Sequence, residues 1–198
     1  MNNSKTKRLV QISVLAAVLI IMSFTPLGYL KVGVLSITFN CIPVVIGAIV
    51  IGPSGGAVLG GIFGITSFIQ CFGLDAFGSA LLGINPIFTL IMCLLPRICI
   101  GLTSGFLFKV LSKTKIPDII TYFLCALIGS VTNTVLFVST LILFFRDSEP
   151  LREIGDSIWA VIGAIITVNS LIEAIVCMIL GGIIAKCLHK ITLIKQTR

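Results

Sequence analysis

Charged residues are scarce in this chain of 198 residues: 11% are Asp, Glu, Lys or Arg, whereas 57% are hydrophobic. A soluble domain carries about 25% charged residues, so this composition excludes an ordinary water-soluble enzyme. It also excludes an intrinsically disordered chain, which needs low hydrophobicity and high charge. A nucleic-acid-binding protein is excluded as well, because its basic residues would have to lie on one exposed face. The net charge of +7 therefore requires another explanation.

The chain also lacks the residues of several catalytic sites. Neither GxxxxGKS nor GxxxxGKT occurs, so the phosphate-binding loop used in ATP hydrolysis is missing. His189 is the only histidine, so a hydrolase dyad or a metal-dependent peptidase in the membrane lacks its base or ligands. The seven cysteines are scattered through apolar runs without a CxxC pair, which favours small buried residues over metal ligands. We expect no enzymatic activity, no cofactor and no metal site.

Long apolar segments dominate the chain instead. A helix crosses a bilayer with about 20 apolar residues, so this length allows at most about six or seven spans and no second domain. We predict an all-α membrane protein, in which residues 1–198 form a single bundle of six transmembrane helices. The expected spans are 9–25, 38–52, 54–72, 86–112, 117–145 and 157–187.

The basic residues are sorted along these segments. If the N-terminus is cytoplasmic, ten of the 14 Lys and Arg residues lie on the cytoplasmic side: Lys5, Lys7, Arg8, Lys109, Lys113, Lys115, Lys186, Lys190, Lys195 and Arg198. Most acidic residues fall in the opposite loops, at 75 and 147–156. An excess of Lys and Arg is typical of cytoplasmic loops. The pattern explains the positive net charge without a nucleic acid, and it predicts that both termini are cytoplasmic.

Small residues recur every four positions in two of the segments. Gly56, Gly60 and Gly64 share one face of the third segment, and Gly101 with Gly105 repeats the spacing in the fourth. Such faces allow helix backbones to approach closely within a membrane. They serve packing within this chain or docking of another membrane protein, and the sequence alone favours packing.

A few polar residues lie within the predicted spans, where an ionisable side chain is costly unless it meets a partner or a ligand. Arg97, Asn133 and Asn169 each lie 11 or 12 residues from the outer end of a different segment. At about 1.5 Å per helical residue, all three lie roughly 18 Å below the outer surface. Glu173 follows Asn169 by one helical turn on the same face. We expect an outward-opening pocket at this depth.

Each of these residues has two interpretations. Arg97 binds an anionic group of a ligand through its planar fork, or it forms a buried ion pair with Glu173 that joins two helices. Asn133 and Asn169 recognise hydroxyl and amide groups of a small molecule, or they join helices by hydrogen bonds.

Further residues at outer levels are expected to complete the pocket. Asn40, Gln70 and Asn85 lie near the outer ends of three segments and are expected to form a polar rim. Phe68 lies at a similar level and is expected to supply part of an apolar wall.

Several stretches carry a resemblance to a known family. Residues 38–48, with the Gly52-Pro53 turn and the glycines that follow it, form the first part of the pattern. The polar stretches at 95–98, 129–134 and 169–173 form the second part. Together they resemble the substrate-binding components, or S components, of energy-coupling factor (ECF) vitamin transporters, and most closely the pantothenate-type branch.

The resemblance implies a transport subunit in a bacterial plasma membrane. It implies high-affinity capture of a small water-soluble vitamin, best matched by pantothenate, from outside the cell. A membrane coupling protein and two ATPase subunits would drive release inside. The family docks on the coupling protein through paired alanines of its first helix, and the corresponding residues here are Ser13 and Ala17. The alternatives are riboflavin or another vitamin, and a stand-alone carrier coupled to protons through Glu173.

Overall fold

The computed structural model describes residues 3–25, 28–32, 35–149, 151 and 168–194. The helices are α1 (Asn3–Ser23), α2 (Cys41–Val50), α3 (Pro53–Gln70), α4 (Ala76–Ile84), α5 (Pro86–Leu111), α6 (Asp118–Phe145), α9 (Val168–Val176) and α10 (Gly182–Ile194). A π-helical turn, Cys177–Gly181, joins α9 to α10. The strands β1 (Tyr29–Val32) and β2 (Leu35–Thr38) pair antiparallel as a hairpin.

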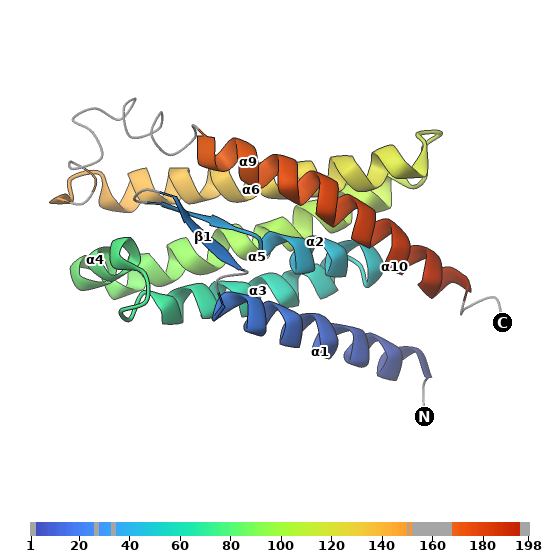
Figure 1. The fold of residues 1–198 in the computed structure, drawn as a ribbon, viewed down its shortest axis with the longest axis horizontal. Coiled ribbons are helices and arrows are strands. Elements are labelled where there is room, and N and C mark those ends of the chain that lie inside the picture. The colour runs from blue at the N-terminus through green and yellow to red at the C-terminus, as the bar shows by residue number, and fades with distance from the viewer. Residues whose placement is uncertain (1–2, 26–27, 33–34, 150, 152–167, 195–198) are drawn as a thin grey trace.

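The long helices run along the longest axis of the molecule (Figure 1). Both termini and the loop between α5 and α6 lie at one end, whereas α4 and the hairpin lie toward the other. Within the described ranges, four helical segments are long and apolar enough to cross a membrane: Lys5–Ser23, Pro86–Leu111, Asp118–Phe145 and Ser170–His189. The structure thus supports a multi-pass membrane protein.

The predicted span at 38–52 differs from the structure. Its first residue, Thr38, ends β2, and α2 has only 10 residues, which at about 1.5 Å per residue cannot cross a bilayer alone. The hairpin also departs from the all-α prediction, and its β-branched Val32, Ile37 and Thr38 favour extended backbone. In the sixth predicted span, 157–187, the first residues lie outside the described ranges, and the helix extends to Ile194.

Local sequence signals explain where the helices begin. Gly52 takes a φ of 104°, a region that favours glycine, and Pro53 then opens α3 at a position where its missing N–H removes no hydrogen bond. Pro86 opens α5 in the same way, and the Asn85 side chain accepts hydrogen bonds from two N–H groups of the first turn. These caps set the register of α3 and α5.

The glycine faces of α3 and α5 pack directly against each other. A Cβ at Gly60 would lie 2.1 Å from the carbonyl oxygen of Arg97, and one at Gly64 would lie 2.8 Å from the Cα of Leu94. Similarly, a Cβ at Gly101 would lie 2.1 Å from the Gly56 backbone. Packing within the chain, the use that the sequence favoured, is therefore confirmed for these glycines. The contact also places the backbone of Arg97 against α3.

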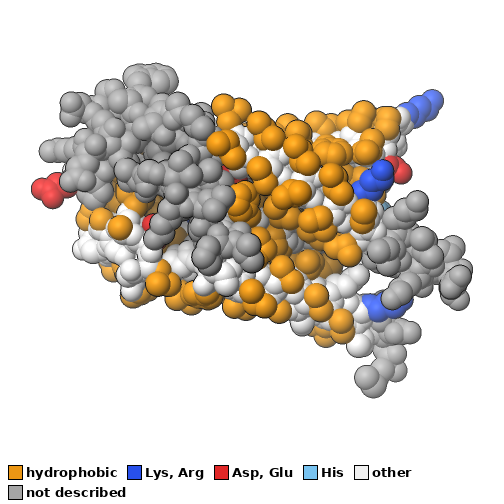
Figure 2. Space-filling view, in the orientation of Figure 1, with side chains coloured by type: hydrophobic (Ala, Val, Ile, Leu, Met, Phe, Trp, Pro, Cys, Tyr) orange, Lys and Arg blue, Asp and Glu red, His pale blue; other side chains and the backbone are white. Residues whose placement is uncertain are grey.

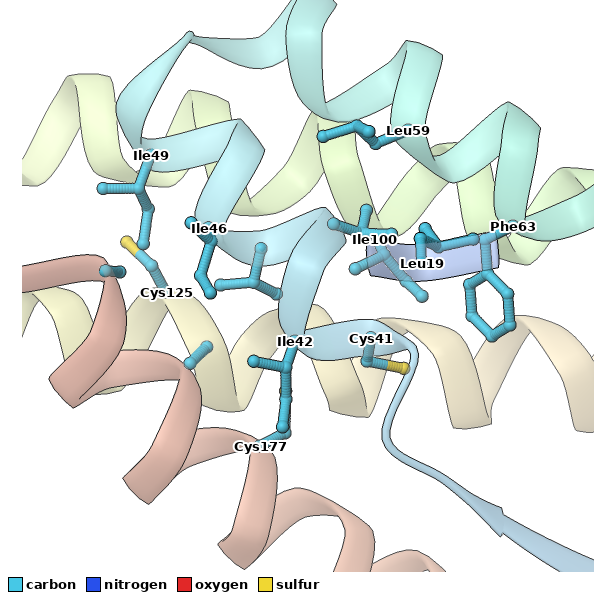
Figure 3. Close-up of a cluster of buried hydrophobic side chains, with 14 of the residues drawn as sticks. Leu19, Cys41, Ile42, Ile46, Ile49, Leu59, Phe63, Ile100, Cys125 and Cys177 are labelled. Carbon is cyan, nitrogen blue, oxygen red and sulfur yellow. The ribbon is translucent and has the colours of Figure 1, made fainter. Parts of the chain in front are cut away.

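The main core surrounds α2, in which nine of the 10 residues are buried. Side chains from other helices converge on it, as Figure 3 shows: Leu19, Leu59, Phe63, Ile100, Cys125 and Cys177. Cys41 and the other cysteines are free thiols, and most are buried. The short helix α2 therefore lies at the centre of the bundle, surrounded by the longer helices.

The surface separates by residue type along the long axis (Figure 2). Apolar side chains cover the middle of the visible face, and most of the visible Lys and Arg side chains lie toward the end that carries the termini. Large apolar residues stay exposed on α1 and α6, for example Leu9 at 65% and Leu143 at 74%. A broad apolar band of this kind suits contact with lipid.

Candidate functional site

Arg97 is the charged centre of the candidate site. It lies on α5 and is only 8% exposed. Its Nη1 donates a hydrogen bond to the Met92 carbonyl oxygen at 3.0 Å. Its guanidinium carbon lies 5.4 Å from the centroid of the Phe63 ring on α3 and 5.3 Å from that of Phe137 on α6. The rings attract the cation without neutralising its charge.

Glu173 joins several elements through its carboxylate. Asn133 on α6 donates to it from Nδ2 at 3.3 Å, and the Cys41 thiol at the start of α2 donates at 3.4 Å. The backbone N–H of Thr38, the last residue of β2, donates at 3.5 Å. Glu173 therefore ties α9 to α6, to α2 and to the base of the hairpin.

The two ionisable residues interact electrostatically without touching. Arg97 acts on Glu173 through space, but within the described residues the guanidinium makes no ion pair with this or another carboxylate. The interpretation of a direct Arg97–Glu173 ion pair is therefore wrong. A buried guanidinium whose charge is not neutralised by contact is suited to an anionic ligand.

Several buried polar atoms of the bundle have no partner. In the described part of the chain, four buried side-chain atoms have no hydrogen-bond partner: Asn40 Oδ1, Arg97 Nε, Ser130 Oγ and Asn133 Oδ1. Leaving such an atom unpaired costs about 1–3 kcal/mol. Ser130, Asn133 and Phe137 recur at helical spacing on α6, and Phe137 contacts Arg97, so three of the atoms belong to facing parts of α5 and α6. They offer a donor, a hydroxyl and an acceptor to a ligand.

A second polar network lies at the end of α1. The Asn40 amide nitrogen donates to the Ser23 hydroxyl at 3.1 Å, and that hydroxyl also meets the Thr66 hydroxyl at 3.1 Å. Gln70 donates from its amide to the Ser23 carbonyl. The predicted rim residues Asn40 and Gln70 thus connect α1, α2 and α3. Asn40 is also linked to Glu173 through one residue, because its backbone N–H donates to Thr38 Oγ1 at 3.3 Å and the Thr38 N–H donates to the carboxylate.

The remaining predicted residues are placed differently. Asn85 caps α5, with 3.1 and 3.2 Å bonds from backbone N–H groups, and Phe68 packs edge-on against Phe72 with ring centroids 5.3 Å apart. Asn169 lies on α9, but its side chain is outside the described residues. Ser13 and Ala17 are exposed on α1.

Sequence reasoning did not single out the aromatic and hydroxyl residues that complete the cluster. Phe137 follows Asn133 by four residues and Ser130 precedes it by three, so helical spacing alone puts them on one face. Phe63 follows Gly60 by three residues on the face of α3 that packs on α5. A search one helical turn before and after each polar or small residue would have found Phe63, Ser130 and Phe137.

Comparisons with known proteins give the family to which this sequence is similar. The family model for the substrate-specific component of ECF transporters matches residues 7–185. The pantothenic acid transporter PanT of Lactococcus lactis subsp. cremoris is 30% identical over 158 residues, covering 75% of this chain and 76% of that protein. The pantothenate transporter PanT of Leuconostoc mesenteroides subsp. mesenteroides is 32% identical over 120 residues, covering 58% of this chain and 57% of that protein.

Proposed function

Because this chain belongs to the family of substrate-specific components of ECF transporters, we propose that it captures pantothenate with high affinity for ATP-driven uptake. The family assignment predicted from the sequence is confirmed, and the family's role is transport, not catalysis. The substrate proposal draws on the two relatives that are named as pantothenate transporters.

The observation that carries the substrate proposal is the buried Arg97, which has an unpartnered Nε and no carboxylate of the described chain in contact. Pantothenate has one carboxylate, one amide and two hydroxyl groups. Arg97 binds the carboxylate, because a guanidinium fork matches its geometry. Asn133 and Ser130 pair with the amide and hydroxyl groups through their unpartnered oxygens. Glu173 holds Asn133 in place through the 3.3 Å hydrogen bond, and Asn169 is the further polar candidate on α9.

The aromatic residues of the cluster favour pantothenate over riboflavin. A flat riboflavin ring system would need free aromatic faces on which to stack. Phe63 and Phe137 instead lie against the Arg97 guanidinium, and Phe68 packs on Phe72.

The rest of the transporter supplies the energy. The chain has no phosphate-binding loop, so a membrane coupling protein and two ATPase subunits drive release into the cell. The chain spans the bacterial cell membrane several times, with both termini cytoplasmic. Ser13 and Ala17 are exposed and small, and they dock on the coupling protein through close backbone contact.

Ligand identification tests the substrate. Protein purified in detergent without added vitamin should release pantothenate on denaturation, identified by mass spectrometry. Titration calorimetry on ligand-free protein should then show tight binding of pantothenate and none of riboflavin. Binding of riboflavin alone, or of neither vitamin, would overturn the substrate proposal.

Reconstitution tests the mechanism. Uptake into proteoliposomes should require the coupling protein, both ATPases and ATP. Ala17→Trp should prevent assembly with the coupling protein and leave pantothenate binding intact. Accumulation by this chain alone in response to a proton gradient would instead identify a secondary carrier.

A further inference from the structure

Pro96 interrupts α5 immediately before the residue at the centre of the candidate site. In an α-helix the N–H of each residue donates to the carbonyl four residues earlier, and for position 96 that is Met92. Proline has no N–H, and its ring pushes this carbonyl away. Pro96 lies inside the 26-residue helix and is fully buried. The Met92 carbonyl therefore needs another donor.

Arg97 supplies that donor from its side chain. Its Nη1 meets the Met92 carbonyl oxygen at 3.0 Å. A guanidinium has five N–H groups, and those of Nε and Nη2 form one edge that matches the two oxygens of a carboxylate. Nε is buried without a partner, and Nη2 makes no hydrogen bond to the described residues. One side of the fork is thus anchored, and the carboxylate-binding edge is unused.

Neighbouring elements restrict the guanidinium further. The Phe63 and Phe137 rings lie 5.4 and 5.3 Å from its central carbon. Gly60 lets α3 approach so closely that a Cβ there would lie 2.1 Å from the Arg97 carbonyl oxygen. The backbone and the side chain of Arg97 are both held, so rotation of the fork away from Met92 is restricted.

We infer that Pro96 is a positioning residue for substrate carboxylate recognition. By removing one N–H from α5, it leaves the Met92 carbonyl to anchor Nη1 of Arg97, which keeps the Nε and Nη2 edge available to the carboxylate. This inference rests on the proposed capture of pantothenate and adds how its carboxylate is selected. Proline is normally excluded from a helix interior because it leaves a carbonyl without its backbone donor. Here the Arg97 side chain donates to that carbonyl instead.

The test compares two ligands that differ only at the carboxylate. Pro96→Ala returns an N–H that competes for the Met92 carbonyl, so pantothenate affinity should fall about tenfold, as expected for weakening a charged hydrogen-bond array. Affinity for pantothenol, which has an alcohol in place of the carboxylate, should change less than about twofold because it does not use the charged array. Both are measured by calorimetry on the full chain in detergent. Pro86→Ala is the matched control, because a proline at the first helical position removes no internal bond.

The outcomes separate this inference from the proposed function. Failure of the unmutated chain to bind pantothenate overturns both. Two outcomes would overturn the role of Pro96 alone, provided that the unmutated chain binds pantothenate. In the first, Pro96→Ala binds pantothenate as tightly as the unmutated chain; in the second, Pro96→Ala loses the same affinity for pantothenate and for pantothenol. If thermal unfolding shows that Pro96→Ala does not fold, Pro96→Ser replaces it, because serine also returns the N–H. The ratio of its affinities for pantothenate and pantothenol is then compared with that of the unmutated chain. Arg97→Lys should weaken the discrimination between the two ligands, because an ammonium keeps the charge but has no planar fork.

Discussion

The polar network around Ser23 and the cluster around Arg97 are both buried, but they differ in how fully their atoms are paired. Around Ser23, Asn40 and Gln70 donate to one residue and join three helices, and Asn40 Oδ1 is the unpaired atom. Around Arg97, the unpaired atoms come from Arg97, Ser130 and Asn133. Interhelical adhesion suits the first pattern, and ligand recognition suits the second.

The comparison shows why polarity within a span is not sufficient to identify a binding residue. Asn40 is fully buried and Asn133 is 6% exposed, so burial does not distinguish them. What differs is the chemistry of their surroundings: Asn133 faces a carboxylate and lies one turn from a ring that contacts a guanidinium.

Arg97→Ala should produce the largest effect. Truncating a buried charged partner removes several kcal/mol of binding, so pantothenate affinity should fall by about 100-fold or more. Calorimetry on the purified variant measures this loss. Arg8→Ala is the control, because Arg8 lies in the first part of α1 and its side chain donates to the exposed Ser54 hydroxyl, not to a residue of the Arg97 cluster. Unaltered affinity in Arg97→Ala would assign Arg97 a structural role and remove the basis of the comparison.

Asn133→Ala and Gln70→Ala form a matched pair that tests the comparison directly. Each removes one amide from one of the polar groups. Asn133→Ala should lower pantothenate affinity about tenfold, whereas Gln70→Ala should change it less than about twofold. Equal losses of affinity would show that both groups line one binding site, as the rim prediction from the sequence had it.

Gly60→Ala should lower pantothenate affinity less than the preceding variants do. It acts indirectly, because Gly60 on α3 packs against the backbone of Arg97. Its Cβ would lie 2.1 Å from the Arg97 carbonyl oxygen, so the backbone must move. The expected cost is about 1–3 kcal/mol of the free energy of unfolding, with weaker pantothenate binding as a consequence. Thermal unfolding and calorimetry measure the two effects. At neighbouring Gly61 a Cβ would meet no atom within 4 Å, so Gly61→Ala should leave both unchanged or raise stability slightly.

Helix location was predictable because apolar length and capping residues are local signals. The expected segments at 86–112 and 117–145 correspond to α5 at Pro86–Leu111 and α6 at Asp118–Phe145. The hairpin before α2 was not predicted, because each strand has only 4 residues and the hydrophobic pattern of so short a stretch does not distinguish a strand from a helix. Likewise, the position of Asn85 in the sequence is compatible with a rim residue and with a helix cap. Only its hydrogen bonds to the first turn of α5 show that it is a cap.

The amino-acid sequence by itself determined the membrane class and the sorting of charge, and it marked Arg97 as a candidate, because hydropathy and the cost of a buried charge depend on residue type and depth. Only the tertiary structure decided which polar atoms pair with each other. It directed the side chains of Asn40 and Gln70 toward Ser23, and it directed Glu173 toward Asn133, Cys41 and Thr38. The physical reason is that a hydrogen bond depends on ångström-scale distance and direction between helices, which spacing along one helix does not contain.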